Sequence, residues 1–117
     1  MIRNSLLWLS EQQQIFNFVR RNGLAKKFAS RFVAGETIPE AVAAASALEA
    51  KGITASLDLL GESVSQAAAA EAACDQYVQM VDEMAAAHDQ VNVSVKLTQM
   101  GFDIDEDLCL RNMTRIL

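Results

Sequence analysis

Three short apolar segments, separated by stretches with helical periodicity, constrain most strongly what this chain can fold into. They cover residues 31–35, 53–60 and 92–97, and glycine ends the first two. Their β-branched and other apolar residues favour strands. Strands that alternate with amphipathic helices usually pair in parallel through right-handed crossovers. The sequence therefore predicts an α/β fold with about three parallel strands.

Capping residues mark where the helices between these strands begin. Thr37 is a good N-cap, Glu40 lies three residues later where it can bond back, and Pro39 fits the first turn. Residues 65–87 are rich in Ala, Gln and Glu, and this composition predicts one long helix.

The two ends of the chain are also predicted to be helical. Asp103 or Asp105 can cap a last helix that begins at Glu106. Near the N-terminus, apolar residues recur at helical spacing. We therefore expect an N-terminal helical segment over residues 1–30, followed by the α/β part over residues 31–117.

Composition argues against several function classes. The formal net charge of −5 provides no electrostatic footprint for nucleic acid. Cys74 and Cys109 lie far apart without metal-ligand spacing, which favours a reducing compartment. With His88 as the only histidine, neither a metal site nor a catalytic triad is expected. No apolar run reaches the roughly 18 residues that cross a bilayer.

Charged side chains are predicted at the ends of the second and third strands. Lys96 ends the third strand, Asp58 lies near the end of the second, and Glu62 follows Gly61. An unpaired ammonium at the end of a buried strand is costly. The carboxyl ends of parallel strands share one edge, so these groups can surround a cavity in which lysine binds a carboxylate. The alternative is that they form structural salt bridges and caps.

Three motifs resemble those of bacterial monofunctional proline dehydrogenases. They are RFVAGETI at 31–38, TASLDLLGE at 54–62 and VSVKLTQMG at 93–101. Their order and spacing match the family, and so does the tail DIDEDL at 103–108. The resemblance covers nearly all of the chain from about Arg31 onward. It implies the N-terminal portion of a distorted (β/α)8 barrel.

The resemblance also implies an activity. That activity is the FAD-dependent oxidation of L-proline to 1-pyrroline-5-carboxylate, with electrons passed to a membrane quinone. Lys96 would ion-pair with the substrate carboxylate, Glu62 would act as an active-site gate, and Asp58 would support the lysine. The implied localisation is cytoplasmic, with a peripheral contact at the inner face of the membrane.

Chain length places a limit on that expectation. A barrel of this type needs roughly 250 residues, so we expect the 117-residue chain to be an N-terminal fragment without activity of its own. The main FAD contacts are expected beyond it. The alternative is a non-catalytic α/β module that self-associates, because a three-stranded sheet leaves both edges unpaired.

Overall fold

The computed structural model describes residues 21–29, 33–87, 89–90 and 92–117, and the chain divides into two compact units, Met1–Ala34 and Gly35–Leu117. In the first unit, helix α3 spans Gly23–Ala29. The Asn22 side chain accepts a hydrogen bond from the Leu24 backbone N–H at 3.1 Å, which satisfies a donor of the first turn. Helix α3 lies within the helical segment predicted for residues 1–30, of which residues 1–20 and 30 lie outside the described ranges.

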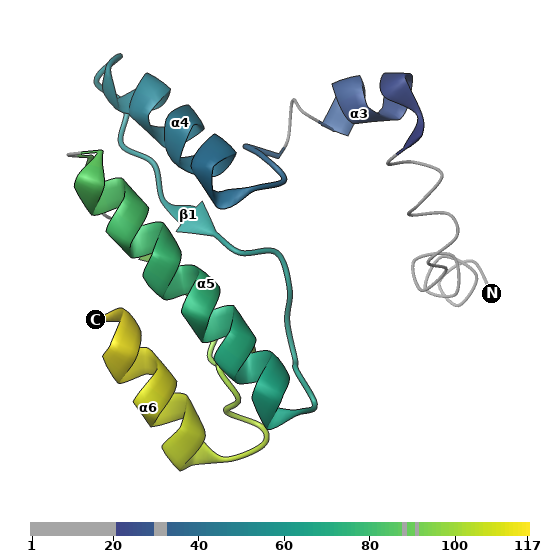
Figure 1. The fold of residues 1–117 in the computed structure, drawn as a ribbon, viewed down its shortest axis with the longest axis vertical. Helices are drawn as coiled ribbons and strands as arrows, with labels where there is room; N and C mark the ends of the chain where they lie inside the picture. The colour runs from purple at the N-terminus through teal and green to yellow at the C-terminus, as the bar shows by residue number, and fades with distance from the viewer. Residues whose placement is uncertain (1–20, 30–32, 88, 91) are drawn as a thin grey trace. The chain divides into compact units, whose positions relative to one another are not determined.

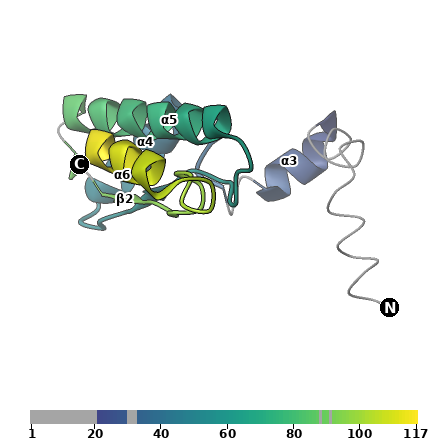
Figure 2. The same ribbon diagram turned by 90° about the horizontal axis from the view of Figure 1, so that it is seen from below.

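The second unit mixes helices with a small parallel sheet (Figure 1). Along the chain it contains α4 (Ile38–Glu49), β1 (Leu57–Asp58), α5 (Ala67–Ala86), β2 (Val93–Ser94) and α6 (Glu106–Ile116). In the sheet, Leu57 lies opposite Val93 and Asp58 opposite Ser94. Figure 2 shows the three helices gathered on one side of β2. The predicted alternation of helices and parallel strands is therefore confirmed for this unit.

The strand predicted at residues 31–35 is wrong over its described part. Residues 33–35 are not a strand, and residues 31 and 32 lie outside the described ranges. The backbone here leads into the cap of α4, where the N–H groups of Glu36 and Thr37 donate to Glu40 Oε2 at 2.9 and 3.1 Å. Gly35 lies so close to α4 that an added Cβ would clash with the Glu40 Cβ. The backbone donors directly after residues 33–35 are thus used in capping, and the chain leads into α4.

Helix starts agree with the sequence prediction. Thr37 and Glu40 form a full capping box at α4, and Pro39 lies in its first turn. Asp105 caps α6 and accepts a hydrogen bond from the Asp107 backbone N–H at 2.9 Å. Gly52, at φ +77°, follows α4 in the conformation expected of a stop signal.

Helix α5 connects two apolar clusters, because it packs against α4 along one part and against α6 along another. Met80 and Met84 of α5 pack with Val42 and Ala45 of α4 and with Leu57 of β1. The second cluster is built from α5, α6 and the segment after β2: Ala73, Cys74, Tyr77, Met100, Cys109 and Ile116. Both clusters bury strand side chains, so the helices fix one face of the sheet.

Candidate functional site

The strand segments present two different faces. Leu57, Leu59, Val93 and Val95 are buried or packed against the helix clusters. Because side chains alternate along a strand, the residues between them point to the opposite side. Those residues are Asp58 and Leu60 from the first segment, and Ser94 and Lys96 from the second. The helices thus leave the charged side chains on the open face.

Asp58 and Lys96 form an ion pair on this face. Lys96 Nζ lies 2.9 Å from Asp58 Oδ2. Lys96 is two residues beyond Ser94, which pairs with Asp58 in the sheet, so the contact is a diagonal cross-strand pair. The hydrogen bond from Lys96 lowers the pKa of the Asp58 carboxyl, and a bond from Tyr77 adds to this effect. The carboxylate is therefore held in its charged form.

The ion pair is more exposed than the sequence suggested. The relative exposure of the side chains is 37% for Lys96 and 43% for Asp58. The expectation of an ammonium at the end of a buried strand is thus wrong for the described residues, because no layer covers this face of the two strands. A half-exposed pair contributes little to stability, about 0–1 kcal/mol.

Tyr77 reaches this ion pair from the helix side. Its side chain is fully buried on α5, and its hydroxyl lies 3.1 Å from Asp58 Oδ1. Burial raises the pKa of the phenol to about 12, with a further contribution from Asp58. Helical spacing within a long helix indicates only core packing for a tyrosine at this position. The available signal was the hydroxyl, since a tyrosine on the buried face of a helix must find a polar partner.

The Tyr77 hydroxyl is inserted where the parallel ladder would continue. Leu57 N–H donates to Asn92 O at 2.9 Å, so the register places the next bond between Leu59 N–H and Ser94 O. Instead, Leu59 N–H donates to the Tyr77 hydroxyl at 3.1 Å, and that hydroxyl lies 2.8 Å from Ser94 O. The strands predicted over 53–60 and 92–97 are much shorter, and at their carboxyl ends a side chain interrupts the pairing.

Gln99 and Gly61 fix the chain beyond this point. Gln99 is buried, and its Nε2 donates to Leu59 O at 3.4 Å. Gly61 has φ +147°, and an added Cβ would lie 2.9 Å from Gln99 Nε2, so a glycine is needed here. The next residue, Glu62, is exposed. The structure brings Asp58 and Lys96 together but shows Glu62 in no ion pair with a described residue.

The Asp58–Lys96 pair is arranged so that the Lys96 ammonium can exchange one anionic partner for another. Lys96 is reachable from solvent and is held by a single carboxylate, which an incoming carboxylate can replace or join. Across the described ranges there is no cluster of three or more His, Cys, Asp or Glu side chains that could hold a metal ion. Nor does that part of the chain include a helix long and apolar enough to cross a membrane.

No family model matches the chain. Its full length is 36% identical to a proline dehydrogenase of Deinococcus radiodurans and 32% identical to proline dehydrogenase 1 of Bacillus subtilis strain 168. Proline dehydrogenase 2 of the same Bacillus strain is 30% identical over 98% of the chain. The similarity to proline dehydrogenases is confirmed. The chain spans 38% of the length of each of these proline dehydrogenases.

The similarity to proline dehydrogenases runs through the whole candidate site. Asp58 and Glu62 lie in one of the motifs that resemble this family, and Lys96 lies in another. Tyr77 lies between these motifs on α5, within the same aligned length. The substrate-binding role of Lys96, the gate role of Glu62 and the supporting role of Asp58 stay predictions.

Proposed function

We propose that this chain supplies the first β/α units of a proline dehydrogenase barrel. In the complete barrel, the reaction would be the FAD-dependent oxidation of L-proline to 1-pyrroline-5-carboxylate, with electrons passed to a quinone. The full-length similarity to three proline dehydrogenases supports this assignment. The small parallel sheet with helices on one side is compatible with part of such a barrel.

One observation carries the proposal: the Lys96 ammonium, 2.9 Å from Asp58, on the face of the strands that the helices leave open. In a (β/α)8 barrel the helices surround the strands, so the opposite face points inward, and sites form at the carboxyl ends of the strands. Lys96 follows the carboxyl end of β2. We propose that it binds the proline carboxylate there while Asp58 holds it in position.

The residues present fit a carboxylate ligand better than a whole flavin. The strand segments 57–60 and 93–98 carry a single cationic residue, Lys96, whereas the diphosphate of FAD carries two negative charges. When bound, FAD would accept the electrons of the oxidation. This chain would bind and orient the substrate carboxylate, with the flavin contacts supplied by the rest of the barrel. Glu62, beyond the Gly61 turn, is proposed to gate the same site.

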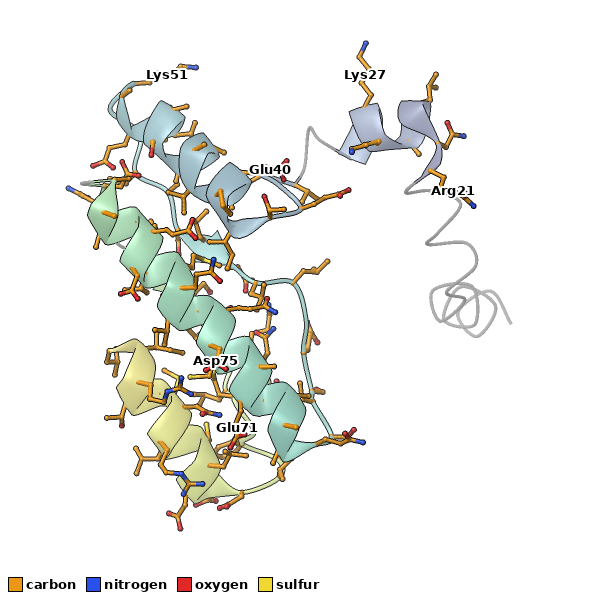
Figure 3. The ribbon with its side chains drawn as sticks, in the orientation of Figure 1. Arg21, Lys27, Glu40, Lys51, Glu71 and Asp75 are labelled. Atoms are coloured by element: carbon orange, nitrogen blue, oxygen red, sulfur yellow. The ribbon has the colours of Figure 1, made fainter. Side chains whose placement is uncertain are left out.

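The test replaces Lys96 in a chimera in which this chain substitutes for the aligned segment of the Deinococcus radiodurans proline dehydrogenase. In the complete barrel the proposed pair between Lys96 and the proline carboxylate would be enclosed, and loss of one partner of a buried ion pair costs about 3–5 kcal/mol. We therefore expect Lys96→Ala to raise the KM for proline by at least about a hundredfold. Lys51→Ala is the matched control. Lys51 is an exposed lysine beyond the end of α4 (Figure 3), and its loss should leave KM unchanged.

Two further measurements make this test decisive. Flavin content and thermal unfolding of both variants establish that the chimera is assembled. In an assembled chimera, an unchanged KM in Lys96→Ala would remove this residue from the substrate site.

The 117-residue chain alone is expected to bind neither flavin nor proline tightly. Stoichiometric flavin on it would contradict the proposal that the flavin contacts are supplied by the rest of the barrel. Self-association stays a separate prediction, which sedimentation in dilute buffer can check.

A further inference from the structure

The Tyr77 hydroxyl has more acceptors around it than protons to give. Its oxygen accepts one hydrogen bond, from Leu59 N–H at 3.1 Å. Its single proton faces Ser94 O at 2.8 Å, Asp58 Oδ1 at 3.1 Å and Gln99 Oε1 at 3.4 Å. One proton can serve only one of these acceptors well at a time. The hydroxyl can therefore rotate between the backbone carbonyl and the carboxylate.

We propose that Tyr77 is a positioning residue for the Asp58–Lys96 pair, whose hydroxyl holds one carboxylate oxygen while the other oxygen faces the ammonium. In the chain alone the hydroxyl proton is shared between Ser94 O and Asp58 Oδ1, and as Lys96 turns to an anionic ligand the proton shifts further toward Asp58. This ligand step rests on the function proposed above. The positioning of the pair does not, because it follows from contacts within the chain.

The two carboxylate oxygens of Asp58 have different partners. Tyr77 reaches Oδ1 of Asp58 from the buried side, and Lys96 reaches Oδ2 from the open side. The carboxylate is thereby fixed at both oxygens, and its charge points along the line to the ammonium. Hydrogen bonds to an ionised group are about twice as strong as neutral ones. When Lys96 also binds an anionic ligand, its interaction with Asp58 weakens. The hydrogen bond donated by Tyr77 then makes up for part of that loss at the Asp58 carboxylate.

The same hydroxyl also controls the spacing of the strands. It stands between Leu59 N–H and Ser94 O, where a ladder bond would otherwise bring the two segments together. Lys96 follows Ser94 by two residues, so the separation at this point sets how far its side chain must reach to meet Asp58. A phenylalanine at position 77 would keep the ring in the core but would remove this spacer.

The first experiment measures the titration of the Asp58 carboxyl by NMR in the 117-residue chain. Tyr77→Phe should raise the pKa of Asp58, because the carboxylate loses one hydrogen bond that favours its charged form. Met84→Leu is the matched control, since it alters the buried face of the same helix without touching a polar group. It should change stability and leave the Asp58 titration as in the parent chain.

An unchanged Asp58 titration in a folded Tyr77→Phe chain overturns the proposal. If that variant does not fold, replacement of Tyr77 by 3-fluorotyrosine keeps the ring and the hydroxyl and makes the hydroxyl a stronger donor. The pKa of Asp58 should then fall. An unchanged value with the fluorinated residue likewise overturns the proposal.

The second experiment tests the ligand step in the chimera described above. Tyr77→Phe should raise the KM for proline about tenfold, equal to about 1.4 kcal/mol, with little change in kcat. An unchanged KM in Tyr77→Phe, where Lys96→Ala raises it, overturns the ligand step. An unchanged KM in Lys96→Ala instead contradicts the proposed function, and the NMR result still decides the positioning of the pair.

Discussion

The two faces of the strand segments differ in what holds them. On the helix side, Leu57 and Val93 pack into continuous apolar clusters formed with α4, α5 and α6. On the open side, Asp58 and Lys96 are held by one ion pair, and Leu60 is 95% exposed. One face is thus determined by packing, and the other by a few directed polar contacts.

Stability and chemistry reside on different faces of this unit. Burial of a large apolar side chain is worth about 1.5–3 kcal/mol, whereas an exposed ion pair is worth about 0–1 kcal/mol. The helix side therefore carries most of the folding energy. The open side can exchange partners at little cost, which a binding site requires. Tyr77 joins the two faces, because its ring is in the core and its hydroxyl reaches Asp58.

The largest predicted effect is on the helix side. Met84 is 1% exposed, and Met84→Ala should lower the free energy of unfolding by about 2–5 kcal/mol, because it removes buried contacts and leaves a cavity. Urea unfolding followed by circular dichroism measures the change. Leu60→Ala is the matched change on the open face and should alter stability by no more than about 0.5 kcal/mol. Equal losses in the two variants would contradict the conclusion that the helix side carries most of the folding energy.

A smaller effect is predicted at the turn that leaves the open face. Gly61→Ala should cost about 1–3 kcal/mol, because the added Cβ would meet Gln99 at 2.9 Å and φ is +147°. Gly52→Ala is the control. Gly52 also has a positive φ, but it has no neighbour within 4 Å of its added Cβ, so it isolates the backbone cost of about 1 kcal/mol. If Gly61→Ala cost no more than Gly52→Ala, the Gln99 contact would not constrain this turn.

Local signals predicted α4 and α6 because the start of each is determined by residues adjacent in sequence, whereas α5, which has no side-chain cap at Gln66, followed from its Ala-rich composition. Thr37 and Glu40 form their capping box within one turn of α4, and Asp105 caps α6 in the same local manner. The Asp58–Lys96 contact was also accessible, since parallel strands bring equivalent ends together. The order of helices and strands along the chain is enough to predict that these two strand ends lie side by side.

Strand lengths and the role of Tyr77 were not predictable in this way. Whether Leu59 N–H pairs with Ser94 O depends on a hydroxyl that arrives from α5, 18 residues away from Leu59. No periodicity encodes that insertion. The exposure of Lys96 is not encoded locally either, since β-branched neighbours indicate a strand but do not show whether a layer covers its second face.

The smallest predicted effect concerns pH and the open face alone. The folded-state pKa of Asp58 lies below its ordinary value of 3.8, so its stabilising contribution is present above that value and is lost as pH falls through the folded pKa. The Asp58–Lys96 coupling, measured by a double-mutant cycle with Asp58→Asn and Lys96→Met, should be at most about 1 kcal/mol near neutral pH. It should vanish once the carboxyl is protonated and weaken in about 1 M salt. Coupling that persisted in acid would mean that the two side chains interact through packing, and the open face would then resemble the helix face.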